Sequence, residues 1–343
     1  MIRQLTYSDI NPQQWQALVE QSPYATWFQT PEAYEFYAAN PEEMTPFAVG
    51  VVEDVECKAS SPYTLHPTPT LKGVIVGYIT RERSSLKQYF TRRAIIIGGP
   101  LLDEHISDEA LSVLLGAVAS RLMKPIYIES RNFHDYSKWR NIFETNGFAY
   151  QPHYDIHVHC HAQHQMSERR LRELKRAIKN GAEICEAQSE QEIRNWYQIL
   201  SQLYREKVRT PLFSEELFLH FYRNGVGKYL LVQYQGKVIG GMMCPVLEGR
   251  AIYEWYVCGL DEEYRDLCPS VVATHAAIEY AKNHGLPLFD FMGAGVPDQP
   301  YGVRDFKMEF GGELVEHGRF LCVRKPLLYK IGKMGVKWLK RRK

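Results

Sequence analysis

The segment with the most potential for chemistry runs from Gly293 to Gly312 and reads GAGVPDQPYGVRDFKMEFGG. It combines flexible glycines and two prolines with aromatic side chains and the cations Arg304 and Lys307. It follows the apolar run LFDF, which predicts a buried strand that ends near Asp290. Open α/β sheets bind ligands at the carboxyl ends of their strands. We therefore expect a ligand site here, where a cation can stabilise a developing negative charge.

Hydrophobic periodicity predicts alternating strands and helices along the whole chain. The predicted strands are 46–53, 73–80, 94–98, 124–130 and 154–160, then 229–234, 237–247, 251–258, 286–292 and 314–323. The predicted helices are 11–21, 108–122, 137–146, 167–181, 190–208, 214–224, 269–284 and 301–309. This order indicates an α/β protein, and the length allows two domains.

The two halves of the chain match each other. Pro125 corresponds to Pro287 at an offset of 162 residues, and Gly147 corresponds to Gly311 at an offset of 164. A nearly constant offset over the same order of elements predicts a duplicated domain. Chance similarity between two α/β segments is the alternative.

The repeat serves as an internal control for the candidate site. At an offset of 164, Arg304 falls on Arg140, but Lys307 falls on Phe143. The arginine is therefore interpreted as a requirement of the fold, whereas Lys307 is particular to the second half. The alternative to a functional role is that Lys307 is an ordinary exposed lysine on a helix. Whether exposed or in a groove, we expect this lysine to contribute little to the stability of the fold.

Three segments resemble the Fem-type aminoacyltransferases, which build the interpeptide bridges of peptidoglycan. They are the helix RRLRELKRAIKNGAEI, the strand FDFMG and the segment YGVRDFKMEFGG. The family motifs R-x-x-I-x-K-A-x-x-x-G, Asp-Phe and F-K-x-x-F-G fall on 172–181, 290–291 and 306–311. The long helical hairpin of some members is missing, and the phosphate-binding residues of the family's first domain have no match here.

The resemblance implies two tandem GNAT-like (acetyltransferase-type) domains, each with a mixed central sheet flanked by helices. We expect an N-terminal domain over 1–160, a C-terminal domain over 161–324 and a basic tail over 325–343. The implied reaction moves an aminoacyl group from aminoacyl-tRNA to an amine of a lipid- or nucleotide-linked peptidoglycan precursor, without a cofactor.

The resemblance carries the catalytic role over to Lys307, which would stabilise the oxyanion while Arg304 and Arg265 steer anionic parts of the substrates. A basic helix face could contact phosphate or RNA, or it could simply be solvated. The expected substrate-binding residues are Tyr301, Phe306, Arg265, Tyr256, Asp290, Lys175, Arg176 and Lys179.

A coenzyme A donor can be tested against the sequence. GNAT domains hold the diphosphate on a glycine-rich turn at a helix N-terminus. The corresponding stretch from Leu260 to His284 contains no glycine, and Pro269 stands where the helix would begin. This disfavours acetyl-CoA or acyl-CoA. Two alternatives remain: an acyl-CoA-dependent enzyme that acts on a surface polysaccharide or lipid precursor, and a binding protein on an inactive GNAT scaffold.

A histidine-rich strand could suggest a metal site. His157, His159 and His161 share one face of the predicted strand, because side chains alternate along a strand. No cysteine or carboxylate completes a known ligand spacing, so we expect no metal.

Charge and composition bear on the compartment and the tail. The 343 residues carry 41 Lys or Arg and 40 Asp or Glu, but residues 325–343 hold eight of the cations and no acid. The remaining body is therefore acidic, which argues against a broadly basic nucleic-acid surface. Seven cysteines without a C-x-x-C pair, and no apolar run of about 18 residues, predict a cytoplasmic protein.

The tail predicts an amphipathic helix that begins at Pro326. Leu327, Ile331 and Met334 lie on its apolar stripe, and lysines lie opposite. We expect peripheral association with the anionic inner face of the membrane. Packing of the stripe onto the protein's own body is the alternative.

Overall fold

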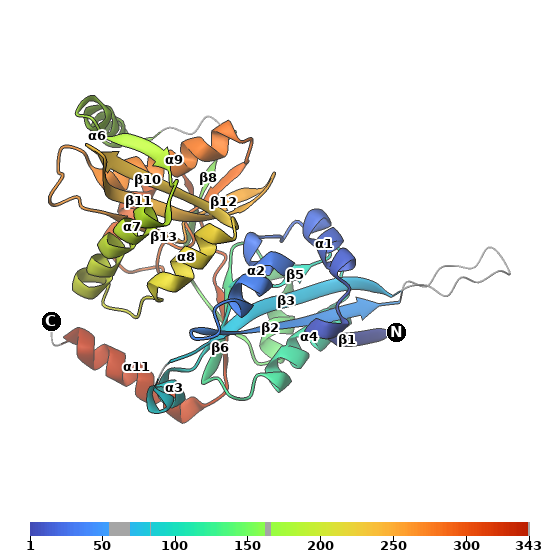
Figure 1. The fold of residues 1–343 in the computed structure, drawn as a ribbon. Helices are drawn as coiled ribbons and strands as arrows, with labels where there is room; N and C mark the ends of the chain where they lie inside the picture. The colour runs from blue at the N-terminus through green and yellow to red at the C-terminus, as the bar shows by residue number, and fades with distance from the viewer. Residues whose placement is uncertain (55–68, 83, 162–165, 342–343) are drawn as a thin grey trace, which may run out of the picture. The chain divides into compact units, whose positions relative to one another are not determined.

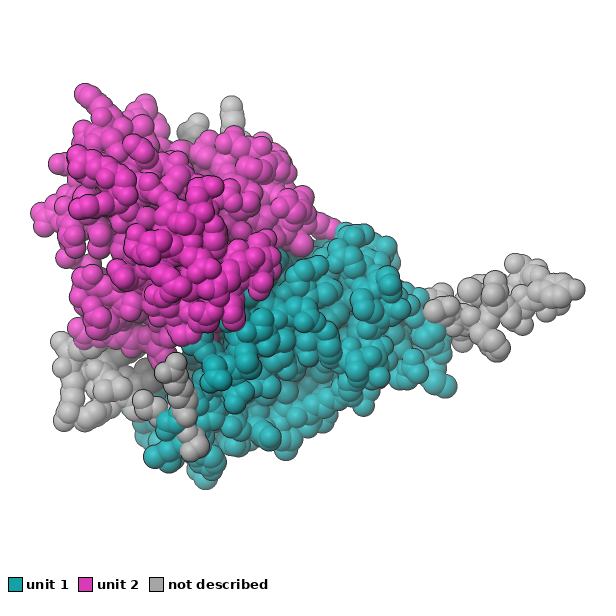
Figure 2. Space-filling model, in the orientation of Figure 1, with its two compact units in different colours: residues 1–152, 317–343 teal, residues 153–316 magenta. Residues whose placement is uncertain are grey.

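The chain folds into two compact units (Figures 1 and 2). Unit 1 comprises residues 1–152 and 317–343, and unit 2 comprises residues 153–316. Both contain strands and helices, so the expected pair of α/β domains is confirmed. The computed structural model describes residues 1–54, 69–82, 84–161 and 166–341.

Unit 1 contains, among its described residues, an eight-stranded mixed sheet in the order β1-β2-β3-β4-β6-β16-β7, with β5 paired to β3. Only β4 and β6 run parallel in the described pairings. The strands are β1 (Ile2–Thr6), β2 (Met44–Glu53), β3 (Thr70–Thr80), β4 (Ala94–Gly98), β5 (Leu101–Leu102), β6 (Tyr127–Asn132), β7 (Ala149–Gln151) and β16 (Arg319–Val323). The helices are α1 (Pro12–Gln21), α2 (Pro31–Ala38), α3 (Ser85–Thr91), α4 (Asp108–Arg121), α5 (Arg140–Thr145) and α11 (Pro326–Arg341).

Unit 2 contains, within its described part, an eight-stranded sheet in the order β9-β10-β11-β12-β14-β8-β15, with β13 paired to β11. Here β12 and β14 are the parallel pair. The strands are β8 (Asp155–His159), β9 (Glu183–Glu186), β10 (Gly227–Tyr234), β11 (Lys237–Leu247), β12 (Ala251–Tyr253), β13 (Tyr256–Gly259), β14 (Leu288–Asp290) and β15 (Glu313–Val315). The helices are α6 (Glu168–Lys179), α7 (Glu190–Leu203), α8 (Glu215–Arg223), α9 (Pro269–Asn283) and α10 (Gly302–Met308).

The two sheets have the same strand order and the same pattern of parallel and antiparallel pairs. In each sheet, one strand comes from the sequence that borders the other unit. β8 follows β7 in sequence and pairs with β14 in unit 2, whereas β16 follows β15 and pairs with β6 in unit 1. The units therefore differ from the expected ranges 1–160 and 161–324. The expected strand 314–323 is divided by a turn in which Gly318 adopts φ +67°, and its two parts join different sheets.

Each sheet is covered by a long apolar helix. In unit 1, Leu111 and Leu114 of α4 pack in one buried cluster with Val49 and Ile75 of the sheet. In unit 2, Ile278 of α9 is buried in a cluster with residues of β11 and β14. Each such side chain stabilises the fold by about 1.5–3 kcal/mol.

The C-terminal helix predicted from the basic tail is confirmed as α11. Leu327, Ile331 and Met334 are 78%, 56% and 62% exposed. These three side chains are open to solvent, whereas Leu328 on the same stripe is half-buried, so packing onto the body and membrane association both stay predictions. None of the helices in the described part of the chain has both the length and the apolar character needed to span a membrane.

Candidate active site

The candidate site is built at a fork between two strands of unit 2. β12 and β14 pair in parallel as far as Tyr253 and Asp290, and Glu254 N–H donates to the Asp290 carbonyl over 2.9 Å. Beyond this bond, β13 stays paired with β11, while the chain after Asp290 stays bonded to the other side, where the Phe291 N–H donates to the Ile156 carbonyl over 3.1 Å. Strands that part at their carboxyl ends leave room for a ligand.

Lys307 extends from α10 into this fork. Its ammonium group donates to the carbonyls of Phe291 and Gly293 at 2.8 and 2.9 Å and pairs with Glu254 Oε1 at 2.9 Å. The residue is only 8% exposed, so the alternative of an exposed helix lysine is wrong. Burial raises the pKa of the Glu254 carboxyl, and the nearby Lys307 charge opposes that rise. The fork therefore holds an ammonium group that is bonded to two backbone carbonyls and paired with the Glu254 carboxylate.

Arg304 organises the loop that leads into α10. Its guanidinium donates to the carbonyls of Ala294 at 2.8 Å and Val296 at 2.6 Å and lies 5.0 Å from the Tyr154 ring centroid. In unit 1, the equivalent Arg140 lies over a tyrosine at 3.7 Å. The sequence predicts a catalytic role for Arg304 in steering the substrate, but its described contacts hold the loop, and its contact with a tyrosine ring recurs in unit 1.

Tyr301 and Phe306, two aromatic residues of the motif, have different surroundings. Phe306 packs between the Arg170 guanidinium, 4.4 Å from its centroid, and Phe310 at 5.3 Å. Tyr301 precedes the helix and is 43% exposed, with its ring against Gly295, which adopts φ +82°. Tyr301 is thus accessible to a substrate, while Phe306 serves the packing.

Asp290 belongs to a buried ionic cluster at the end of β14. Its Oδ2 lies 3.4 Å from His157 Nε2 on β8, and its Oδ1 accepts the Met292 N–H. Asp155 accepts the Gly293 N–H over 2.6 Å. The cluster thereby fixes the backbone whose Gly293 carbonyl binds Lys307.

The charges of this cluster are set by mutual pairing. Burial opposes the charge on His157, but the Asp290 and Asp155 carboxylates raise the pKa of His157 to about 9. Burial and the Asp290 charge raise the pKa of Asp155 well above its usual value. Three potential ligand atoms lie within 4.8 Å of one another. His157 Nε2 faces Asp290 Oδ2 at 3.4 Å, and we interpret the group as an ion-paired cluster.

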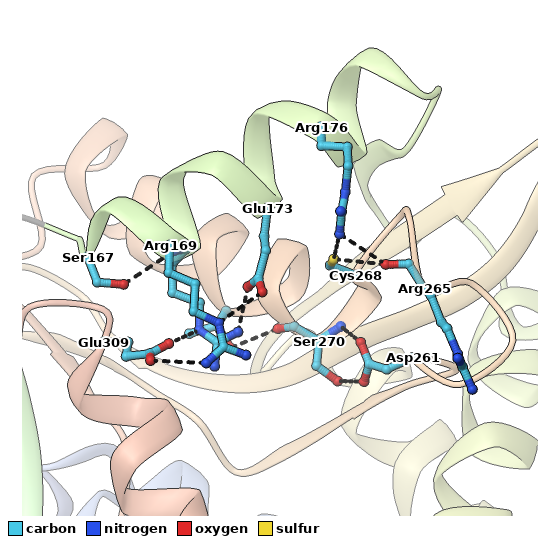
Figure 3. Close-up of polar contacts among 11 residues, drawn as sticks. Ser167, Arg169, Glu173, Arg176, Asp261, Arg265, Cys268, Ser270 and Glu309 are labelled. Carbon is cyan, nitrogen blue, oxygen red and sulfur yellow. Dashed lines mark hydrogen bonds and ion pairs between the residues drawn. The ribbon is translucent and has the colours of Figure 1, made fainter.

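The inner face of α6 is tied to the end of the motif helix (Figure 3). Arg170 pairs with Glu309 at 2.6 Å and Glu173 at 2.5 Å, and Arg169 also contacts both carboxylates. The N–H of Ser167 donates to the Glu309 carbonyl over 2.8 Å. These bonds hold α6 against the segment that carries Lys307.

The outer face of α6 remains open. Lys175 and Lys179 are exposed, and neither takes part in the ion pairs seen in the described part of the chain. Arg176 is different, because its guanidinium lies 3.4 Å from the Arg265 carbonyl and from Cys268 Sγ. The basic face thus divides into two accessible lysines and one arginine that braces the loop before α9.

The N-terminus of α9 is already occupied by a carboxylate of the protein. Asp261 accepts the Ser270 N–H at 3.0 Å and its hydroxyl at 2.5 Å (Figure 3). Pro269 has no N–H, and the Val271 N–H donates to the Cys268 carbonyl. A diphosphate accepts from free amides at a helix N-terminus, and here Asp261 already accepts the Ser270 N–H. Arg265 points away from α6 in the same view, and its described bond is to the Glu262 carbonyl.

Tyr256 lies on β13, just beyond the fork. Its ring packs at 5.1 Å against Phe218 and at 6.2 Å against Tyr204. The structure thus brings Lys307, Asp290, Arg304 and Tyr301 to one loop system, with Tyr256 on the adjacent strand. Arg265, Lys175, Arg176 and Lys179 lie instead on α6 and the loop before α9.

Sequence reasoning missed Glu254, His157 and Asp155 as partners at the fork. Glu254 does leave a signal, because it is the one acid in the apolar run AIYEWYV. A carboxylate in a buried strand requires a cation or hydrogen-bond donor nearby. No comparable signal marks the contact between His157 and Asp290, which depends on the pairing of β8 with β14.

Comparison with known proteins bears on the fold and on the sequence of unit 2. Residues 163–308 match the family model described as an acetyltransferase (GNAT) domain. FemX superposes with a TM-score of 0.68 at 14% identity, over 96% of this chain and 99% of that chain. L-PGS from Bacillus licheniformis gives 0.57 at 12%, over 94% and 96%. A tandem GNAT protein from the clavulanic acid biosynthesis pathway gives 0.55 at 11%, over 94% and 99%.

No curated protein sequence matches the chain. The structural similarities confirm the expected fold of two tandem GNAT-like domains, and the predicted resemblance to Fem-type proteins holds for that fold. The match of residues 163–308 to an acetyltransferase (GNAT) domain confirms the expected class, an acyltransferase enzyme.

Proposed function

We propose that this protein is an aminoacyltransferase that moves an amino acid from aminoacyl-tRNA to an amine of a lipid- or nucleotide-linked peptidoglycan precursor. The observation that carries the proposal is the buried ammonium group of Lys307 at the fork, within the F-K-x-x-F-G segment. Unit 1 has Phe143 at the equivalent position, stacked on Phe320 at 3.9 Å. The fold does not require a cation there, so we assign the charge to the reaction.

The chemistry needs no covalent intermediate. The acceptor amine attacks the ester carbonyl carbon, a C–N bond forms, and the ester C–O bond breaks. The ribose oxygen leaves with the proton that the amine loses. Negative charge on the carbonyl oxygen is stabilised when Lys307 turns one N–H toward it from the Gly293 carbonyl, while Glu254 keeps the ammonium group in place.

The closed N-terminus of α9 favours this donor over acyl-CoA. Asp261 places a negative charge where the diphosphate would lie, and like charges repel. The exposed Lys175 and Lys179 can instead meet RNA phosphates, with Arg265 nearby on the next loop. Such contacts position a nucleic acid without reading its sequence.

An acyl-CoA-dependent enzyme that acts on a surface polysaccharide or lipid precursor is the second candidate. The match of unit 2 to the GNAT family model favours it. Isothermal titration with acetyl-CoA separates the two candidates, because the aminoacyltransferase is expected to give no binding heat.

Association with the inner face of the membrane belongs to the same proposal. The exposed apolar side chains of α11 and its lysines suit an anionic lipid surface, where each cation contributes about 1 kcal/mol. This association would hold the cytoplasmic enzyme beside a lipid-linked acceptor.

Transfer is tested with purified protein, a mixture of aminoacyl-tRNAs, and lipid- and nucleotide-linked precursors, with products read by mass spectrometry. Muropeptides and surface glycans are compared in cells with and without the protein. We expect an added amino acid on the precursor. Turnover only with acyl-CoA would establish the second candidate, and no turnover with any donor would indicate a binding protein.

A further inference from the structure

Helix α3 exposes apolar side chains and buries a polar one. Leu86, Tyr89 and Phe90 are 70%, 55% and 53% exposed, whereas Gln88 is 8% exposed. The Gln88 amide donates to the Thr80 carbonyl over 2.8 Å, which fixes the helix to the end of β3. Adjacent exposed apolar side chains of this size mark an interaction site.

Three segments of unit 1 meet at the edge where α3 lies (Figure 1). The Ile126 N–H donates to the Arg92 carbonyl over 2.8 Å, and the Arg324 N–H donates to the Ile126 carbonyl over 2.8 Å. The end of α3, the loop before β6 and the start of α11 are therefore neighbours. The Lys325 ammonium group lies 5.3 Å from the Tyr89 ring centroid, which joins α3 to α11 directly.

All three segments contribute exposed apolar side chains. Met123, in the loop before β6, is 59% exposed and accepts a contact from Arg324 at 2.8 Å. We call the combined area the tripartite surface, which consists of Leu86, Tyr89, Phe90, Met123, Leu327 and Ile331. Its border is basic, because Lys325, Lys330 and Lys333 follow along α11 and no acid occurs from Lys325 onward.

A basic cavity of about 490 Å³ adjoins α3. Arg81, Arg92 and Lys124 line it together with Gln88, and Glu82 is the acid among its lining residues. A phosphate group would be attracted to this excess of positive charge. The cavity shares Gln88 and Arg92 with the α3 region, so it lies at the edge of the tripartite surface.

We propose that the tripartite surface binds an anionic lipid bilayer, with its apolar side chains at the acyl boundary and a lipid phosphate in the adjoining cavity. The proposal rests on the membrane association suggested for α11 and adds α3 and Met123 as a second insertion point. A basic border suits anionic lipid. It disfavours a second copy of this chain, because a two-fold interface would bring the same cations together.

The test uses full-length protein and vesicles of phosphatidylcholine, with and without phosphatidylglycerol. The α3 variant is Leu86→Ser/Tyr89→Ser/Phe90→Ser, and the matched control is Ile184→Ser/Val208→Ser, which changes residues 42% and 43% exposed in unit 2. We expect the α3 variant to lose about tenfold or more in binding to anionic vesicles, while the control binds like wild type. Lys124→Gln should lower the preference for phosphatidylglycerol.

Folding of the α3 variant is checked by thermal melting. If it fails to fold, Tyr89→Trp replaces it, and quenching of the tryptophan by brominated lipid is expected. Wild-type binding by the α3 variant, together with lost binding by Ile331→Ser/Met334→Ser, would overturn the role of α3 and leave the membrane proposal standing. No binding by wild type would overturn both. Self-association that only the α3 variant abolishes, without a change in vesicle binding, would overturn the lipid assignment.

Discussion

The two units place different side chains at the same point of one sheet plan. In unit 1, Phe143 of α5 is buried and stacks on Phe320 of β16 at 3.9 Å. In unit 2, Lys307 of α10 is buried at the equivalent position and pairs with Glu254. Because unit 1 fills this position with a buried aromatic side chain, the fold alone does not require the ion pair between Lys307 and Glu254. The difference indicates which unit carries the chemistry.

The ionic clusters beside the parallel strands differ as well. Unit 1 surrounds Glu129 with Arg131 at 2.9 Å and Arg319 at 3.1 Å. Unit 2 pairs His157 with Asp290. Arginine keeps its charge at all ordinary pH values, whereas histidine titrates near neutrality. The Glu129 cluster of unit 1 therefore keeps its charges near neutral pH, whereas the pairing of His157 in unit 2 weakens as the pH rises toward 9.

Phe143→Lys should give the largest effect, because it transfers the cation of unit 2 into unit 1 without its carboxylate. An unpaired buried ammonium group is expected to destabilise unit 1 by about 5 kcal/mol or more. Hydrogen exchange read separately for the two units measures it, and Phe143→Leu is the matched control. Unchanged protection in unit 1 would mean that the two positions are not equivalent.

Lys307→Met should reduce both transfer and stability. Loss of oxyanion stabilisation lowers kcat by about 10²–10³-fold, and the unpaired Glu254 carboxylate destabilises unit 2 by about 3–5 kcal/mol. The expectation that a groove lysine contributes little to stability is wrong, because Lys307 is buried. Lys307→Met/Glu254→Gln should recover stability but not activity. Transfer within a few-fold of wild type in the single variant would remove Lys307 from the reaction.

Alkaline pH should destabilise unit 2. The pKa of His157 is raised to about 9 in the folded state, from an ordinary value of 6.5. The charged imidazole makes its full contribution to the free energy of unfolding below pH 6.5. This contribution, about 3 kcal/mol, is lost as the pH rises through 9. Hydrogen exchange across this range measures the loss, and His157→Gln should remove this dependence. A flat profile in wild type would mean that the imidazole is not charged.

Acid should instead destabilise unit 1. Burial opposes the charge on Glu129, but Arg131 and Arg319 hold its pKa at about 2, below the ordinary 4.5. Its contribution is complete above pH 4.5 and is lost as the pH falls through 2, again about 3 kcal/mol. Glu129→Gln is the control, and its acid unfolding should be less steep. If both proteins unfold in parallel, the two arginines do not stabilise the carboxylate.

Local pattern predicted much of this architecture. The strands 94–98 and 237–247 have the expected bounds, and the helices near 108–122 and 269–284 are present. The exchange of β8 and β16 was not predicted, because periodicity shows that a strand exists but not which sheet it joins. The same limit applies at the site. Lys307 stood out through its glycine-rich surroundings and the contrast with Phe143. Glu254 comes to lie beside Lys307, and His157 beside Asp290, only through the pairing of distant strands.

The smallest expected effect compares the helices that cover the two sheets. α4 is capped by Ser107, whose side chain accepts the Ala110 N–H, and α9 is capped by Asp261. In each helix, a side chain of the protein accepts a backbone N–H that would otherwise be free to bind a phosphate. Asp261→Ala should therefore cost about 1 kcal/mol, the usual effect of a lost helix cap, measured by hydrogen exchange in unit 2. It should not create tight acetyl-CoA binding, because Pro269 still provides no N–H and the Val271 N–H still donates to Cys268. Isothermal titration of the wild type and of Asp261→Ala with acetyl-CoA measures this binding. Strong binding by the wild type would show that a diphosphate displaces the Asp261 carboxylate from the helix N-terminus. The donor would then be a coenzyme A thioester.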